Sequence, residues 1–112
     1  MKIAFYGSSL LSSYWNGAAT YYRGILHAMA KRGHEITFYE PDAFDRQQHR
    51  DIDPPEWCRS VVYAATEDAL AGVLAEAHDA DIVVKANGVG VFDRELLEGI
   101  LRHAAPDALK IY

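Results

Sequence analysis

Residues 1–33 read MKIAFYGSSLLSSYWNGAATYYRGILHAMAKRG, and this stretch decides the fold. The short apolar run from Ile3 to Tyr6 is typical of a strand that is buried on both faces. A loop of small, polar and aromatic residues follows Gly7 before a helical period begins. Gly33 is placed to end that helix in a left-handed conformation. The apolar face of the helix is predicted to carry Tyr22, Ile25, Leu26, Met29 and Ala30.

The same alternation of strand and helix continues to the last residue. Apolar runs predict further strands at Glu35–Tyr39, Ser60–Ala64 and Asp81–Lys85, and ALKIY begins a fifth. A polar, proline-containing connection separates the second and third strands. The segment TEDALAGVLAEAH predicts a helix with Thr66 as its N-cap, and Asp93 is predicted to cap the next helix.

Strands joined by helices of this length imply right-handed crossovers and a parallel sheet. We therefore expect a Rossmann-like, three-layer α/β/α domain with about five strands in the order 3-2-1-4-5. The strand order reverses between the first and fourth strands, and ligands of open α/β sheets bind at such a switch point. The loops at that point are Gly7–Gly17 and the NGVGV stretch at 87–91.

These two loops supply the predicted ligand-binding residues. Glycine lets a ligand approach the backbone, and serine and asparagine can hydrogen-bond its hydroxyl groups. Tyr14 and Trp15 could stack on a sugar ring or a base. We expect Gly7→Val to abolish ligand binding while leaving the fold largely intact. The candidates are Gly7, Ser8, Ser9, Asn16, Gly17, Asn87 and Gly88.

Each candidate also has a purely structural interpretation. Asn16 can be a helix cap, Trp15 can simply cover the sheet edge, and Asn87 with Gly88 is a common turn dipeptide. Lys85 lies in an apolar strand, where it can extend to the end of the sheet or pair with an anion. The position of the loops at the switch point favours the ligand-binding interpretation for the loops as a unit.

Composition excludes several classes of partner. The chain has 112 residues, a net charge of -5 and no cluster of basic residues, so nucleic acid is excluded as a partner. No apolar run reaches the length of about 20 residues needed to span a bilayer. A single cysteine, Cys58, excludes a disulfide framework and fits a reducing compartment. We therefore expect a cytoplasmic location.

Cofactor and metal motifs are missing. The spacing from Gly7 to Gly17 breaks the dinucleotide fingerprint, although Glu40 lies where a ribose-binding acid would lie. No P-loop occurs, and no histidine has metal-ligand spacing. The aspartates between 42 and 53 are interpreted as a solvated loop. We predict no cofactor and no metal, and no catalytic base is assigned, because Glu40 and Asp42 are expected to lie too far from the first loop.

Two stretches resemble a known family. The opening strand and polar loop, followed by GILHAMAKRGHEITFYEPD, resemble the start of GT-B glycosyltransferases, of the kind called family 4-like. The stretch DIVVKANGVGVFDRELLEGI resembles the CgeB-like subgroup of these enzymes. The resemblance covers nearly all of the 112 residues, but only the first half of one of the family's two domains.

The resemblance implies a GT-B fold, in which two Rossmann-like domains face each other across a cleft. Residues 1–112 would be the N-terminal portion of the acceptor-side domain, and the C-terminal donor domain would be absent. The full-length protein would bind a nucleotide sugar and an acceptor, and the loop from Gly7 to Gly17 would face the cleft. This portion alone is expected to be inactive.

Two other functions stay open. The first is a non-catalytic, flavodoxin-like binding or regulatory module, and the second is a nucleotide-dependent oxidoreductase or another Rossmann enzyme. The LKIY ending leads us to expect a portion of a longer protein, the alternative being a small flavodoxin-like domain that lacks its last helix. A second α/β domain downstream would favour the glycosyltransferase, and a visible bound cofactor would favour the oxidoreductase.

Overall fold

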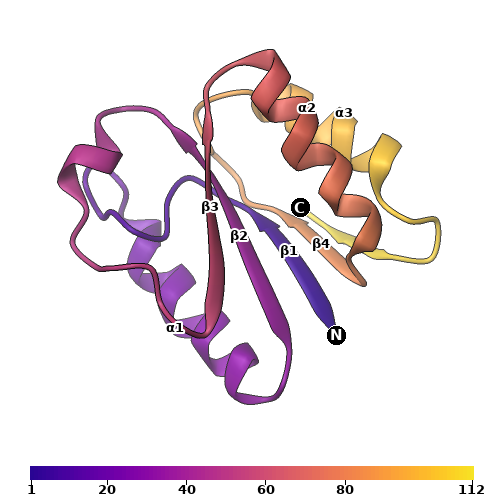
Figure 1. Ribbon diagram of the computed structural model, residues 1–112, viewed down its shortest axis with the longest axis horizontal. Coiled ribbons are helices and arrows are strands. Elements are labelled where there is room, and N and C mark those ends of the chain that lie inside the picture. The colour runs from indigo at the N-terminus through magenta and orange to yellow at the C-terminus, as the bar shows by residue number, and fades with distance from the viewer.

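The structure, a computed structural model, describes all residues from 1 to 112 and contains one all-parallel sheet. Five strands lie in the order β3-β2-β1-β4-β5, which confirms the predicted Rossmann-like topology. Helix α1 covers one face of the sheet, and α2 and α3 cover the other (Figure 1). The strands are β1 (Lys2–Tyr6), β2 (Glu35–Asp42), β3 (Cys58–Ala64), β4 (Ile82–Lys85) and β5 (Leu109–Ile111). The α-helices are α1 (Ala18–Lys31), α2 (Glu67–Ala75) and α3 (Asp93–His103), and two short 3-10 helices are η1 (Arg46–His49) and η2 (Glu76–Asp79).

The central strand β1 contributes to a core on each side of the sheet. Because side chains alternate along a strand, Ile3 and Phe5 point toward α1 while Ala4 and Tyr6 point toward α2 and α3. Phe5 packs against Phe38 with their ring centroids 5.3 Å apart. On the opposite face, the Tyr6 hydroxyl donates to the Val73 carbonyl oxygen at 2.7 Å. This two-sided burial explains why β1 has the near-continuous apolar sequence IAFY.

Strand β2 extends past its predicted end at Tyr39 and includes Pro41. The Tyr39 carbonyl faces β1, where it accepts a hydrogen bond from the Gly7 amide. Pro41 lies two residues further along, so its backbone nitrogen faces the same side. Because β1 has already ended there, a proline, which has no N–H group, costs no hydrogen bond at this position. The sequence prediction ended the strand too early because it took the proline as part of the connection.

The ends of two helices confirm the predicted capping signals. Gly33 has a φ of +92°, its amide donates to Ala30, and the His34 amide donates to Met29, which together form a Schellman ending for α1. The Thr66 hydroxyl accepts from the Ala69 amide at the start of α2.

Two expectations for the helices are wrong. The N-cap of α3 is Phe92, and Asp93 is the first helical residue, with its carboxylate turned back toward the preceding loop. Ile25 is not on the buried face of α1, since 41% of its surface is exposed.

No helix combines the length and the apolar character needed to cross a bilayer.

Candidate ligand site at the carboxyl edge of the sheet

All strands are parallel and end at the carboxyl edge of the sheet, where three of the connections that follow them are longer than two residues. They are the first loop, Gly7–Gly17, after β1; the long connection, residues 43–57, after β2; and the second loop, residues 86–92, after β4. Four non-glycine residues of the chain have a positive φ, and all four lie in these connections: Trp15, Phe44, Asp45 and Phe92. Backbone conformations of this kind concentrate at functional sites in proteins.

The polar side chains of the first loop are buried beneath it. Ser8, Ser9 and Asn16 are exposed by only 3%, 0% and 7% of their surfaces. The Ser8 hydroxyl donates to Asn16 Oδ1 at 2.7 Å, and Asn16 Nδ2 donates to the carbonyl oxygens of Ser9 and Ser12 at 2.9 and 3.0 Å. Asn16 therefore holds the loop together, and it does not cap α1, whose N-cap is Gly17 without a side-chain bond.

Glu40 is the residue that fixes the first loop to the sheet. Its fully buried carboxylate accepts from the Ser9 hydroxyl at 2.6 Å, from the Leu10 and Leu11 amides at 3.1 and 3.4 Å, and from Gln47 Nε2 at 2.8 Å. The expectation that Glu40 lies too far from the loop is wrong, because β2 adjoins β1 and reaches the level of the loop. A glutamate inside an otherwise apolar strand was the signal that could have identified it.

Gly7 is needed for packing within the fold. A Cβ atom at this position would lie 2.5 Å from Phe38 Cζ, and Phe38 is completely buried. The expectation that Gly7→Val leaves the fold largely intact is therefore wrong, because valine would force apart the core beneath α1. Gly17 is exposed, and a Cβ atom there would meet no neighbour within 4 Å.

The long connection is joined to the first loop by directed bonds. Ser12 donates to the His49 carbonyl oxygen at 2.8 Å, and Ser13 donates to Asp51 Oδ2 at 2.8 Å. Arg23 of α1 forms an ion pair with Asp51 at 2.6 Å. The bonds from Arg23 and Ser13 hold the pKa of the Asp51 carboxyl well below its usual range. The aspartates of this connection are exposed, as the interpretation of a solvated loop requires, and Asp51 in addition bonds to α1 and to the first loop.

Exposed aromatic side chains lie above this buried network. Trp15 is 83% exposed with a φ of 47°, and Tyr14 stacks on the His49 ring at a centroid distance of 3.9 Å. The Trp15 ring therefore does not cover the sheet edge. Arg46 donates to the Trp15 carbonyl oxygen at 3.3 Å and lies 4.9 Å from the centroid of the Phe44 ring. Rings displayed in this way offer apolar faces to a flat ligand.

The second loop borders an open hollow of about 680 Å³. Asn87 and Gly88, both predicted, are exposed at its wall. Lys85 also lines the hollow, and its buried amino group donates to Asp93 Oδ1 at 2.8 Å. The anion that pairs with this lysine is therefore the Asp93 carboxylate of the same chain. The lining residues are Lys85, Asn87, Gly88, Asp93, Arg94, Leu97 and Tyr112.

Asp93 organises the second loop as Glu40 organises the first. Its carboxylate also accepts from the Val89 and Gly90 amides at 3.0 and 2.8 Å. Partial burial acts to raise the pKa of Asp93, but the bonds from Lys85 and the two amides outweigh it and lower the pKa. The ionised carboxylate is thus fixed in place and acts as a structural anchor. Glu40 uses about all of its acceptor positions in this way, whereas Asp93 Oδ2 accepts a single bond and keeps one position open toward the hollow.

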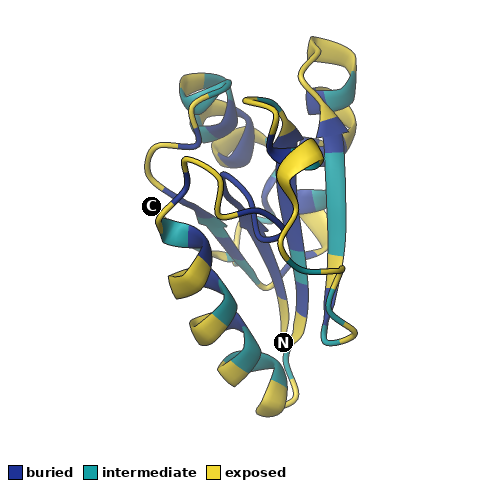
Figure 2. Cartoon of the chain, turned by 90° about the vertical axis from the view of Figure 1, so that its left-hand side faces the viewer, coloured by how far each residue is buried: buried dark blue, intermediate teal, exposed yellow.

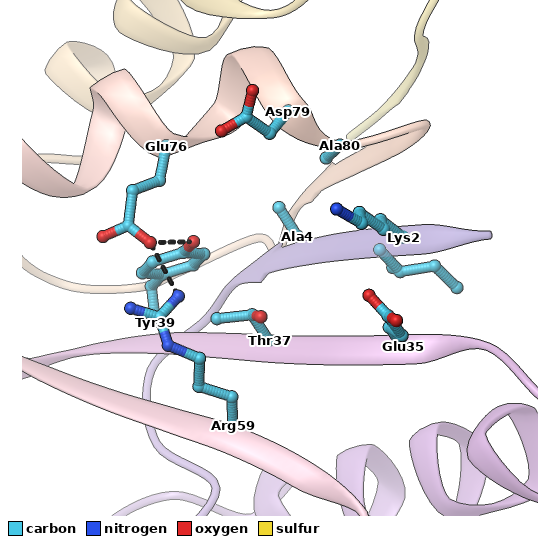
Figure 3. A pocket seen from close by; sticks show the side chains of 10 residues that line it. Lys2, Ala4, Glu35, Thr37, Tyr39, Arg59, Glu76, Asp79 and Ala80 are labelled. Atoms are coloured by element: carbon cyan, nitrogen blue, oxygen red, sulfur yellow. Dashed lines mark hydrogen bonds and ion pairs between the residues drawn. The ribbon is translucent and has the colours of Figure 1, made fainter.

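A second cavity, of about 260 Å³, lies at the opposite, amino end of the strands (Figure 3). There Glu76 accepts from Arg59 at 2.6 Å and from the Tyr39 hydroxyl at 3.1 Å. Burial, together with the nearby Glu76 charge, raises the pKa of Tyr39 to about 12. These groups satisfy one another, and the amino end of a parallel sheet is not where α/β folds bind ligands. The carboxyl edge is therefore the candidate site.

The predicted residues thus have different roles. Asn87 and Gly88 line an open hollow, whereas Ser8, Ser9 and Asn16 face inward and hold the first loop. Gly7 packs against the core, and Gly17 is exposed. Comparisons with protein-family models, curated proteins and solved structures found no match to this chain. The class that the fold defines is a Rossmann-like α/β domain with its candidate ligand site at the carboxyl edge of the sheet.

Proposed function

We propose that this chain is the acceptor-side domain portion of a GT-B glycosyltransferase, which moves a sugar from a nucleotide sugar to an acceptor hydroxyl. The observation that carries the proposal is that exposed aromatic rings, Tyr14 and Trp15, lie at the same edge of the sheet as an open hollow whose lining includes Asn87 and Arg94. Sugar rings are recognised by stacking on aromatic faces and by hydrogen bonds to their hydroxyl groups. The resemblance of GILHAMAKRGHEITFYEPD and DIVVKANGVGVFDRELLEGI to this family supports the same assignment.

In this proposal the chain binds and orients the acceptor. Asn87 and Arg94 at the hollow can donate hydrogen bonds to acceptor hydroxyls, and Trp15 can lie against a ring face. Positioning of this kind lowers the barrier by fixing the attacking hydroxyl near the donor carbon. The nucleotide sugar, and the groups that stabilise its departing diphosphate, belong to the donor domain of the longer protein. The chain by itself is therefore inactive.

A binding experiment tests this function. The chain has two tryptophans, so Trp57→Phe leaves Trp15 as the single fluorescent reporter. We expect saccharide acceptors to change the Trp15 emission and to shift the amide resonances of residues 14–17 and 87–90. Trp15→Ala should weaken saccharide binding at least tenfold, which corresponds to about 1.4 kcal/mol. Saccharides that leave both sets of resonances unchanged would contradict the proposal.

The second candidate is a non-catalytic, flavodoxin-like binding or regulatory module. It is favoured by the two anchoring carboxylates, since Glu40 and Asp93 each accept several bonds that hold a loop in place. The two candidates differ in one measurement on the longer protein. Transfer from a panel of nucleotide sugars to the bound saccharide supports the glycosyltransferase, whereas binding without any transfer supports the module.

A further inference from the structure

The chain contains two asparagines, Asn16 and Asn87, and a glycine follows each of them. Asparagine is chemically labile, because the next backbone nitrogen can attack its side-chain carbonyl carbon and release ammonia. Glycine in the next position favours this deamidation, since it has no side chain to hinder the attack. The two pairs share one local sequence, so their surroundings in the fold decide whether each of them can react.

The Asn16 side chain is held by three hydrogen bonds. It is only 7% exposed, Oδ1 accepts from the Ser8 hydroxyl, and Nδ2 donates to the carbonyl oxygens of Ser9 and Ser12. Its carbonyl carbon can turn toward the Gly17 nitrogen only by breaking these bonds, which would leave buried polar groups without partners. The first loop therefore protects Asn16 from deamidation.

The turn formed by Asn87 and Gly88 has no such restraint. The central strands β1 and β2 are mostly buried, whereas turns and the outer sides of helices are exposed (Figure 2), and both residues of this turn are exposed. The next two amides, of Val89 and Gly90, donate to the Asp93 carboxylate. Neither the Asn87 side chain nor the Gly88 amide forms a hydrogen bond within the chain.

The turn also has room for the reacting groups to meet. Gly88 has a φ of +67°, and a Cβ atom there would meet no neighbour within 4 Å. The Asn87 side chain borders the open hollow, so it can rotate without displacing another side chain. Lys85 before the turn and Val89 after it are both bonded to Asp93. The turn is thus fixed at its two ends and free at its tip.

We propose that Asn87 is a site of spontaneous deamidation in the folded protein, and that Asn16 is protected from the same reaction. The Gly88 nitrogen forms a bond to Cγ of Asn87, the bond from Cγ to Nδ2 breaks, and the Gly88 amide proton leaves with Nδ2 as ammonia. Water then adds to one of the two carbonyl carbons of the succinimide ring and opens it. The products are aspartate and isoaspartate, and neither step needs an oxidant or a reductant.

Both products alter the wall of the hollow. Each has a carboxylate in place of the amide, which adds a negative charge beside Asp93 and removes the hydrogen-bond donor of Asn87. Isoaspartate also adds a methylene group to the backbone of the turn. The reaction itself does not depend on the proposed function, because it involves only the turn and water.

Peptide mapping by mass spectrometry, after incubation of the folded chain at mildly alkaline pH, tests the proposal. We expect aspartate and isoaspartate to form at position 87 at least about tenfold faster than at position 16, because the local opening that frees Asn16 is rarely populated. In urea the two positions should react at similar rates, since their local sequences then decide. Equal rates at both positions in the folded chain would overturn the proposal. So would an Asn87 that reacts in urea but stays intact in the folded chain.

Two glycine variants test whether the Gly88 nitrogen is the attacking group. Gly88→Ala should slow the reaction at Asn87 several-fold, because the new side chain hinders ring closure. Gly72→Ala is the matched control, since a Cβ atom at Gly72 in α2 would also meet no neighbour within 4 Å and the rate at Asn87 should not change. Circular dichroism verifies that both variants fold. Equal rates at Asn87 in the two variants would contradict attack by Gly88.

Discussion

The buried Glu40 carboxylate holds the first loop against the sheet by accepting its hydrogen bonds. Its carboxylate accepts two backbone amides, a serine hydroxyl and a glutamine amide, and none of the side chain is exposed. Removing an acceptor from such a site leaves buried donors unsatisfied. We expect Glu40→Ala to lower the free energy of unfolding by about 3 kcal/mol, and Glu40→Gln, which keeps one acceptor oxygen, by about 1 kcal/mol.

Urea unfolding at neutral pH measures both changes in Glu40. Glu98→Ala is the control, because the Glu98 side chain is 61% exposed and the cost should stay within about 0.5 kcal/mol. If Glu40→Ala proved as mild as Glu98→Ala, the carboxylate would not be holding the first loop.

Asp51 should make stability depend on pH in the acid range. Its pKa in the folded state is depressed by bonds from Arg23 and Ser13, whereas an aspartate in the unfolded chain titrates near about 3.9. A depressed folded pKa contributes stability above the unfolded pKa, and this contribution is lost as pH falls toward the folded pKa. Asp51→Asn should therefore lower stability at neutral pH and flatten its decline below about pH 4. Urea midpoints from pH 7 to pH 2 test this, and parallel profiles for the two proteins would refute it.

At the level of elements, two helical glycines should respond in opposite ways to the same change. A Cβ atom at Gly72 in α2 would meet no neighbour within 4 Å, so Gly72→Ala should stabilise the protein by about 0.5–1 kcal/mol through helix propensity. A Cβ atom at Gly99 in α3 would collide with the buried Leu74 side chain, so Gly99→Ala should cost about 1–2 kcal/mol. Thermal unfolding of the two variants measures both signs. Stabilisation by Gly99→Ala would show that α2 and α3 pack less closely than described.

The elements themselves were predictable because local signals agree with the fold. Apolar runs located all five strands, and Gly33 and Thr66 marked helix ends. The far end of β2 and the start of α3 were not predictable, because they depend on neighbours: Pro41 is tolerated where β1 has ended, and Asp93 turns toward Lys85. A pattern within one segment contains no information on such partners.

The candidate site was predictable in place but only partly in detail. Strand order put the loops at the carboxyl edge, and the Asn87-Gly88 turn was correctly placed at a surface. The sequence does not distinguish a loop serine or asparagine that faces a ligand from one that faces a buried carboxylate, because both environments favour the same residue types. Their inward orientation depends on Glu40, which lies more than twenty residues away in the chain and beside them in space.

At the scale of the whole molecule, the loops of the carboxyl edge form one connected layer. The first loop is bonded to the long connection through Glu40, Gln47 and Asp51, and the long connection reaches the second loop through Phe44. Phe44 is half exposed with a φ of 56°, and its ring lies directly above the Cα position of Gly90. This contact joins segments on opposite sides of β1.

Gly90 should therefore tolerate no side chain while Phe44 is present. A Cβ atom there would lie 2.9 Å from Phe44 Cε2, and the φ of +94° is itself unfavourable for any other residue. We expect Gly90→Ala to cost about 2 kcal/mol, part from the backbone and part from the contact with Phe44. Gly88→Ala is the matched control: its φ is +67° but its Cβ atom would be in open space, so only the backbone cost of about 1 kcal/mol should remain.

In a double-mutant cycle, Phe44→Ala should reduce the cost of Gly90→Ala by at least about 0.5 kcal/mol, whereas the cost of Gly88→Ala should not change. Equal costs of Gly90→Ala with and without Phe44 would mean that the long connection and the second loop are energetically independent.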